Sequence, residues 1–226
     1  MQRPRASRAS GMWDCNFVAF KYPRDAIAAE TAQKGGSVGP FTALILLVTV
    51  AVAIWTSLNL ADNSAIRMGP FLISEFIRPT LPEILEGQVW RLITPVFLHY
   101  GFLHLGFNLM AFIFLGQMIE KRSGTFWLIA LFLISGVFSN LAQYFVSGPG
   151  FGGLSGVDYA LFGYVWMKSK YDPFSGFFIS DQTVVFALVW LVVCFTGMMG
   201  PIANIAHLGG LLVGVVWGFM SARIFR

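Results

Sequence analysis

Five polar side chains lie inside stretches that are otherwise apolar, and their types could together perform chemistry. They are His104, Asn108, Ser155, Asp158 and His207. A polar group in an apolar environment is costly unless it is paired, so each of the five is a functional candidate. A serine becomes a nucleophile when a nearby base takes its proton, and histidine can be that base. Apart from Asp158, these residues form the inventory of a serine hydrolase without a separate acid.

Ser155 stands where a glycine-rich segment runs into an apolar one, in the sequence SGPGFGGLSGVDYALFG of residues 147–163. Gly153 and Gly156 flank it closely, and glycine permits a near approach of backbones and angles that other residues avoid. We expect a helix to begin here, and a helix N-terminus offers unpaired N–H groups and a partial positive charge. A negative charge that develops beside Ser155 would be stabilised.

The other candidates are spaced so that helices can bring them to the same place. His104 and Asn108 are four residues apart and therefore share one face of a helix. His207 lies in Ala206-His-Leu-Gly-Gly210, which Gly214 follows, and such small residues let two helices touch. If the helices of Ser155 and His207 pack together, His207 can act as the base. The Ser155 N–H, His104 and the Asn108 amide are then natural donors to an oxyanion.

The composition places these residues in a membrane protein. Of 226 residues, 56% are hydrophobic and 12% are charged, and the mean hydropathy is +0.69. We expect an all-α polytopic bundle of six transmembrane helices, because the apolar runs approach the length that spans a bilayer. The net charge of +4 does not indicate nucleic acid, since the basic residues lie in short loops and an N-terminal tail. We expect spans at 41–58, 102–119, 126–146, 154–167, 183–196 and 202–219.

The segments outside these spans carry further expectations. Residues 1–40 are predicted to be a cytoplasmic tail, and 41–226 the six-helix domain; no signal peptide is indicated. The fourth span has only about 14 residues, so Ser155 should begin below the membrane surface. Lys168 to Asp181 is expected to be a polar loop. Trp90 and Arg91 form an aromatic and cation pair suited to lipid headgroups.

The basic residues predict an orientation. With a cytoplasmic N-terminus, twelve of the fifteen Lys and Arg residues fall on the cytoplasmic side. This positive-inside asymmetry favours six spans with both chain ends in the cytoplasm. Ser155 is then reached from the outer face.

The combination of motifs resembles the rhomboid family of intramembrane serine proteases over about residues 88–220. The resemblance is carried by Trp90-Arg91, the spacing of His99, His104 and Asn108, the Gly-Leu-Ser-Gly of 153–156 with Tyr159, and Ala206-His207 with Gly210 and Gly214. It implies that Ser155 is the nucleophile and His207 the general base. It implies an oxyanion hole of His104, Asn108 and the Ser155 amide, a Tyr159 ring packed against His207, and a supporting role for His99, Gly153, Gly156 and Gly210.

The resemblance also implies partners and a place in the cell. The substrates would be transmembrane segments of other membrane proteins, cut in a bacterial inner membrane, with no metal or cofactor. The residues indicate no particular oligomeric state. The alternative is a non-catalytic binder of transmembrane helices, which would lack Ser155 or His207; a transporter would show internal repeats.

Asp158 departs from the family pattern, in which an apolar residue usually precedes the tyrosine. Because it lies three residues after Ser155, it could hydrogen-bond His207 as a third catalytic member. Pairing with another helix is the alternative.

Overall fold

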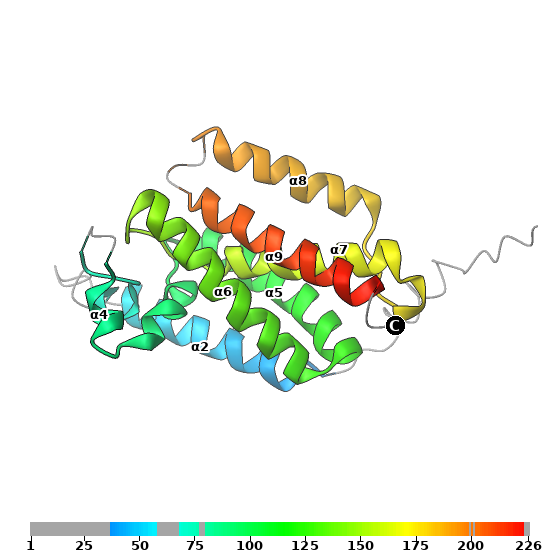
Figure 1. Cartoon of the computed structure of the whole chain (residues 1–226), viewed down its shortest axis with the longest axis horizontal. Coiled ribbons are helices and arrows are strands. Elements are labelled where there is room, and N and C mark those ends of the chain that lie inside the picture. The colour runs from blue at the N-terminus through cyan, green and yellow to red at the C-terminus, as the bar shows by residue number, and fades with distance from the viewer. Residues whose placement is uncertain (1–36, 58–67, 77–79, 199, 201, 224–226) are drawn as a thin grey trace, which may run out of the picture. The chain divides into compact units, whose positions relative to one another are not determined.

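The computed structural model describes residues 37–57, 68–76, 80–198, 200 and 202–223. The predicted tail therefore lies almost wholly outside the described residues. Within them every regular element is a helix (Figure 1). The long helices are α2 (Pro40–Ser57), α5 (Phe102–Ser123), α6 (Thr125–Ser147), α7 (Ser155–Tyr171), α8 (Asp181–Phe195) and α9 (Asn204–Arg223). The short ones are η1 (Gly69–Phe71), α4 (Pro82–Leu85), η2 (Val89–Leu92), η3 (Thr94–Phe97) and η4 (Pro173–Ser175).

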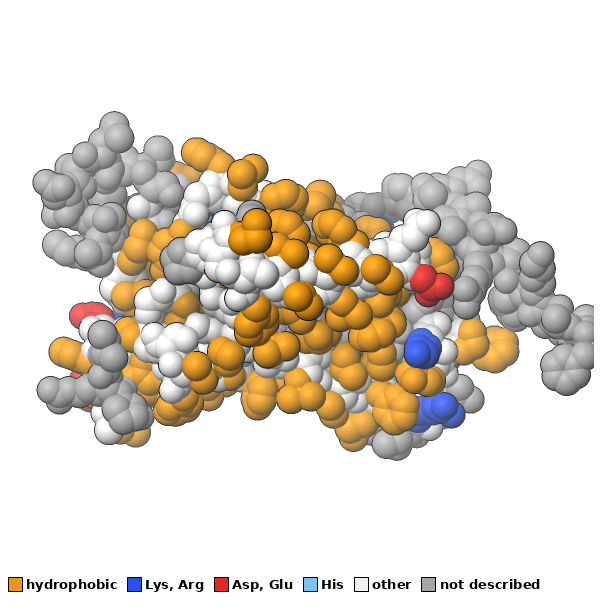
Figure 2. Space-filling view, turned by 90° about the horizontal axis from the view of Figure 1, so that it is seen from above, with side chains coloured by type: hydrophobic (Ala, Val, Ile, Leu, Met, Phe, Trp, Pro, Cys, Tyr) orange, Lys and Arg blue, Asp and Glu red, His pale blue; other side chains and the backbone are white. Residues whose placement is uncertain are grey.

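The membrane character of the bundle is visible on its surface. Among the described helices, α5, α6 and α9 are long and apolar enough to cross a membrane, and Pro40–Thr56 and Asp181–Phe195 are shorter apolar helices. Figure 2 shows hydrophobic side chains across the middle of one face, with Lys and Arg side chains gathered toward one end. The chain is therefore a helical membrane protein.

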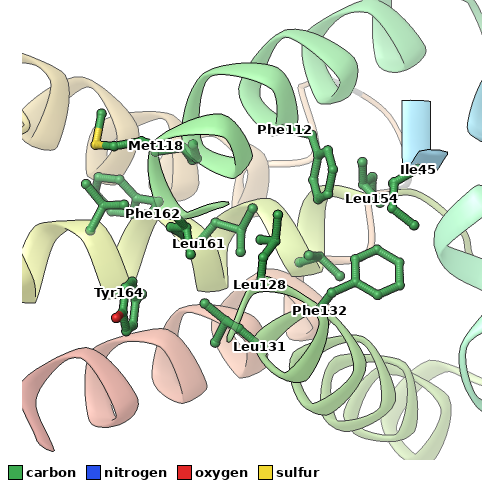
Figure 3. Close-up of a cluster of buried hydrophobic side chains, with 14 of the residues drawn as sticks. Ile45, Phe112, Met118, Leu128, Leu131, Phe132, Leu154, Leu161, Phe162 and Tyr164 are labelled. Atoms are coloured by element: carbon green, nitrogen blue, oxygen red, sulfur yellow. The ribbon is translucent and has the colours of Figure 1, made fainter. Parts of the chain in front are cut away.

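The core lies between α5, α6 and α7, where large apolar side chains are fully buried. Phe112 of α5, Leu128 and Phe132 of α6, and Leu161 of α7 belong to this cluster (Figure 3). Most of α7 is enclosed by the other helices, because its side chains are buried along most of its length. A functional group on α7 is thus held on a rigid central element.

The contact between α7 and α9 is a backbone contact. A Cβ atom added at Gly210 of α9 would overlap the carbonyl oxygen of Gly156, and one added at Gly214 would overlap that of Ala160. Only glycine leaves room for so close an approach of two helices. The expectation that Gly210 and Gly214 let two helices touch is confirmed, and the second helix is the one that begins with Ser155.

Glu120 lies near the C-terminal end of α5 and joins three helices. Its carboxylate is buried and accepts hydrogen bonds from the Phe41 N–H (2.9 Å), from the Thr42 N–H and hydroxyl (2.9 and 2.6 Å) and from the Thr125 hydroxyl (2.9 Å). The first two donors are among the N–H groups that the start of α2 leaves unpaired. Glu120 thus caps α2 and holds it to α5 and α6.

The fourth helix is longer than the sequence indicated. We expected a span of 154–167 and a polar loop from Lys168 to Asp181, but α7 has 17 residues and continues to Tyr171. The ammonium group of Lys168 forms an ion pair with Asp172, just beyond the helix end, where a cation also suits the helix dipole. The corrected length is roughly 25 Å, which is still shorter than a ~30 Å hydrocarbon layer.

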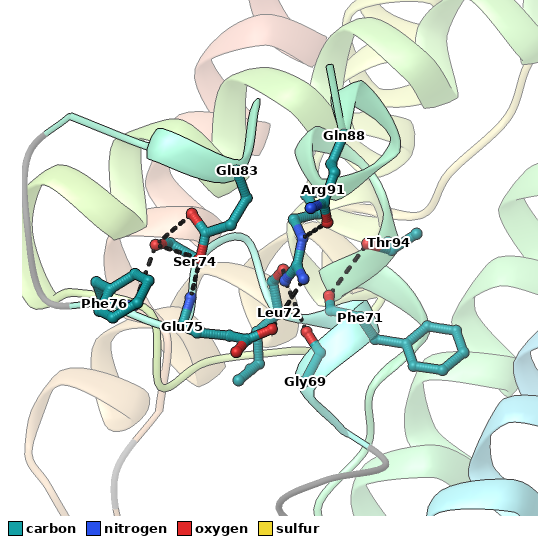
Figure 4. Close-up of polar contacts among 10 residues, drawn as sticks. All are labelled: Gly69, Phe71, Leu72, Ser74, Glu75, Phe76, Glu83, Gln88, Arg91 and Thr94. Carbon is teal, nitrogen blue, oxygen red and sulfur yellow. Dashed lines mark hydrogen bonds and ion pairs between the residues drawn. The ribbon is translucent and has the colours of Figure 1, made fainter. Parts of the chain in front are cut away.

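The connection that precedes α5 is built around Arg91, whose side chain is buried. Its guanidinium donates to the carbonyl oxygens of Gly69 (2.7 Å) and Leu72 (3.0 Å), to Gln88 (2.7 Å) and to the carboxylate of Glu75 (2.9 Å) (Figure 4). The Arg91 guanidinium is thus bound within the protein, and the expectation that the Trp90-Arg91 pair lies at the headgroup level stays a prediction. A fork of several N–H donors suits this role of tying separate loop carbonyls together.

Candidate active site

Two side chains from the touching helices meet at the centre of the candidate site. Ser155 Oγ lies 2.8 Å from His207 Nε2, within hydrogen-bonding distance. Ser155 is the first residue of α7, and His207 is the fourth residue of α9. The close contact between Gly156 and Gly210 lies one and three residues further along the same helices, so it fixes the separation of the pair.

His207 is buried, and two other residues hold its ring and its helix turn in place. The ring of Tyr159 lies against it, with centroids 4.9 Å apart and planes tilted by 35°. The carbonyl oxygen of the Gln143 side chain accepts hydrogen bonds from the N–H groups of Ile205 and Ala206, both at 3.0 Å. Gln143 therefore caps α9 just before His207 and orients its first turn.

Gln143 is a functional residue that the sequence reasoning missed. The signal was present, because Gln143 is an amide inside the apolar run 126–146. What the sequence does not give is its partner, since Gln143 and Ile205 are 62 residues apart. A helix cap supplied by a distant helix leaves no local pattern.

His104 is placed as a hydrogen-bond donor beside Ser155. Its Nδ1 accepts from the Tyr100 N–H at 3.4 Å, so the ring proton resides on Nε2. A Cβ at Gly153 would lie 2.8 Å from this Nε2 and 3.6 Å from Ser155 Oγ. Gly153 also has a φ of +127°, which strongly favours glycine. Only a residue without a side chain leaves this space open.

Asn108 adds a second donor one turn further along α5. It is buried, and among the described residues its Nδ2 has no hydrogen-bond partner. Buried amides usually have partners in a folded protein. An unpaired amide on the helix that carries His104 is free to bond an oxyanion that forms only during a reaction.

His99 holds the glycine-rich loop against the connection before α5. Its Nδ1 bonds the carbonyl oxygen of Phe97 at 3.1 Å, and its Nε2 accepts from the Leu154 N–H at 3.4 Å. The Gly153 N–H donates to the carbonyl oxygen of Pro95 at 3.0 Å. Burial, and to a lesser degree the neighbouring His104, lower the pKa of His99 to about 4, which keeps the ring neutral. A neutral ring is what both hydrogen bonds require.

Asp158 makes no hydrogen bond to His207. Both carboxylate oxygens of Asp158 and the Nδ1 atom of His207 are buried, and none of the three has a partner among the described residues. The structure therefore brings together Ser155 with His207, Tyr159, His104 and the flanking glycines, but it leaves Asp158 outside this set of contacts.

A serine and an imidazole paired between two helices of an apolar bundle define a membrane-embedded protein of the serine hydrolase type. The model of the Rhomboid domain matches residues 86–224. The chain belongs to the rhomboid family. It is 36% identical over 217 residues to a protein named Rhomboid protease GlpG from Salmonella paratyphi A, a match that covers 96% of this chain and 73% of the relative. Proteins of the same name from Salmonella typhi and Salmonella newport match with the same identity and coverage.

Proposed function

We propose that Ser155 and His207 are the catalytic pair of this chain, which is an intramembrane serine protease. One distance carries this assignment, namely the 2.8 Å between Ser155 Oγ and His207 Nε2. With its ring proton on Nδ1, His207 accepts the serine proton at Nε2 while Ser155 attacks the carbonyl carbon of a substrate peptide bond. His207 then donates that proton to the leaving amine. Water hydrolyses the resulting ester with the same base.

The oxyanion of each tetrahedral intermediate is stabilised by three donors. These are the Ser155 N–H at the start of α7, the Nε2–H of His104 and the Nδ2–H of Asn108. The positive end of the α7 dipole adds to their effect. Support comes from the unpaired Asn108 amide and from the proton that the Tyr100 contact places on His104 Nε2.

The substrates are transmembrane segments of other membrane proteins, cut near the outer end of the segment. A helix in a membrane keeps its carbonyl groups in internal hydrogen bonds, so segments weakened by small or helix-breaking residues are preferred. We place six spans in a bacterial inner membrane with both chain ends in the cytoplasm. The asymmetry of Lys and Arg along the chain supports this orientation.

Cleavage of a model transmembrane substrate by purified protein in detergent tests the assignment. Wild-type protein should cut the substrate, and Ser155→Ala and His207→Ala should each lower the rate at least ~10³-fold. A fluorophosphonate should label Ser155 in wild-type protein and label it much more slowly in His207→Ala. Undiminished cleavage by Ser155→Ala would refute the catalytic pair.

A further inference from the structure

Asp158 is an acidic residue inside the membrane bundle that the proposed mechanism does not use. It is only 6% exposed, and neither carboxylate oxygen has a hydrogen-bond partner among the described residues. A buried carboxyl without a partner is strongly unfavourable, and such groups in membrane helices mark sites of function. Asp158 lies three residues after Ser155, which places their Cβ atoms about 5–6 Å apart.

The contacts of α7 show which way Asp158 faces. Gly156 and Ala160 face α9, Val157 lies against Gly136 of α6, and Tyr159 donates to the carbonyl oxygen of Ala187 in α8 at 3.3 Å. Successive residues turn by about 100° around a helix, so Asp158 falls on the side that remains. That side is opposite α9, midway between the α6 side and the α8 side, and it faces α5.

Asn108 of α5 is a second buried polar group near the proposed active residues. Its Nδ2 has no hydrogen-bond partner among the described residues, and the ring of its neighbour Phe107 lies 6.4 Å from the ring of Trp190 in α8. Helices α5 and α7 thus each carry one buried side chain without a partner in the described part of the chain, Asn108 one turn after His104 and Asp158 three residues after Ser155.

No cation within the described bundle can neutralise Asp158. In the helices α5 to α9, Lys and Arg occur only near one end of the bundle, at Lys121, Arg122, Lys168, Lys170 and Arg223. Lys168 is ten residues along the same helix, which is about 15 Å away, and it already pairs with Asp172. The part of the chain that the structure describes therefore supplies no cation to Asp158.

Helix α8 is joined to α5 and α7 by few specific contacts. Val185, Phe186, Val189 and Val192 of α8 are each more than half exposed, and α8 stands apart from the other long helices in Figure 1. Its links to α7 and α5 include the Tyr159 hydrogen bond and the Phe107 ring contact. Displacement of α8 would open a path for a peptide to Ser155, which lies three residues before Asp158 on α7.

We propose that Asp158 is a specificity-determining residue that receives a Lys or Arg side chain of the substrate next to the scissile bond. The inference rests on the proposed protease function. An extended peptide advances about 3.3 Å per residue, so the basic residue lies within about two positions of the cleaved bond. The ion pair offsets two unfavourable free energies. One is that of the buried Asp158 carboxyl, and the other is that of a Lys or Arg cation inside a membrane segment of the substrate.

A set of matched substrates tests this specificity. Each carries Lys, Gln or Met at one of the two positions on either side of the cleaved bond, and kcat/KM is measured for wild type, Asp158→Asn and Asp158→Leu. Wild type should favour Lys over Met by about 10-fold or more at one position. Asp158→Leu should reverse this ratio, and Asp158→Asn should remove the preference for Lys over Gln. Asp172→Asn, which removes a carboxylate beyond the far end of α7, should keep the wild-type ratio.

Three outcomes overturn the proposal. The first is that wild type cuts the Lys, Gln and Met substrates equally at every position. The second is that Asp158→Leu retains the wild-type ratio. The third is that the Asp158 variants lose activity equally on all substrates, which is the result of a purely structural role. Cleavage of the Met substrate distinguishes a failure of the Asp158 proposal from a failure of the proposed protease function. If it is cut in a Ser155-dependent manner, the protease assignment stands whatever the ratios show.

Discussion

The backbone contact between α7 and α9 makes Gly210→Ala a sharp test of how the catalytic pair is positioned. The new methyl group would overlap the carbonyl oxygen of Gly156. Neither atom belongs to a flexible side chain, so the conflict is relieved only if the two helices move apart. His207 lies three residues before Gly210, and Ser155 lies one residue before Gly156. The displacement is therefore transmitted to the pair.

The size of the effect follows from the geometry. Restoring ordinary van der Waals contact requires a shift of roughly 1 Å or more. A shift of this size between Ser155 and His207 would lengthen their 2.8 Å separation beyond hydrogen-bonding distance. A misplacement of this size costs about 10²-fold in rate. Overpacking of the interface should also lower the free energy of unfolding by about 2 kcal/mol.

Gly209→Ala is the matched control, because it adds the same atom to the neighbouring position of the same helix. Its Cβ would meet the Cβ of Ala142 and the ring of Phe138 at 3.5 Å, which is ordinary contact. Cleavage of a model substrate and thermal unfolding in detergent should be measured for both variants. Gly209→Ala should behave like wild type or be slightly more stable, since alanine favours helix. Equal activity and stability of the two variants would refute the positioning role of the contact.

Three further predictions concern the supports of the bundle. Gln143→Leu leaves the N–H groups of Ile205 and Ala206 unpaired, so it should lower the free energy of unfolding by about 2 kcal/mol and reduce kcat. An unchanged kcat would show that Gln143 does not orient His207. Glu120→Gln places an amide N–H₂ group among hydrogen-bond donors, so it should lower the free energy of unfolding by about 2–4 kcal/mol. The fraction of the variant that remains folded should still be active. A melting temperature equal to that of wild type would contradict this prediction. His99 binds a proton below pH 6.5 when unfolded but only below about pH 4 when folded, so wild type should lose up to about 3 kcal/mol as the pH falls from 6.5 to 4. His99→Gln should lack this part of the pH dependence, and parallel stability curves for the two proteins would contradict the origin assigned to it.

Much of the helical architecture could be predicted from the sequence, because apolar runs and polar exceptions are local features. The run that contains His104 and Asn108 is α5, and the segment that follows the Gly-Leu-Ser-Gly motif is α7. The small residues around His207 predicted a close helix contact, and they form one. These features need only the composition of a segment and its spacing.

Other features depend on interactions that the apolar pattern does not show. Helix α7 continues past the apolar run to Tyr171, and Lys168 near its end pairs with Asp172, four residues further on. Arg91 followed a tryptophan and carried the pattern of a headgroup contact, but the carbonyl oxygens of Gly69 and Leu72 bind it inside the protein. Backbone acceptors have no signature in the sequence, so this inward orientation could not be read from residue types.

The positions of the active residues within their helices have a consequence for the supply of water. His104, Ser155 and His207 are the third, first and fourth residues of α5, α7 and α9, so three helices start around one spot. Each helix start leaves up to four main-chain N–H groups without an internal acceptor, and hydrocarbon offers them none. At α9 the protein supplies the acceptors itself, because the first four N–H groups bond the carbonyl oxygen of Ile202, the Gln143 side chain and the carbonyl oxygen of Ala203. At α7 the main chain supplies an acceptor only from Asp158 onward, through the carbonyl oxygen of Leu154, so the N–H groups of the turn that begins with Ser155 are the ones that can bind the hydrolytic water.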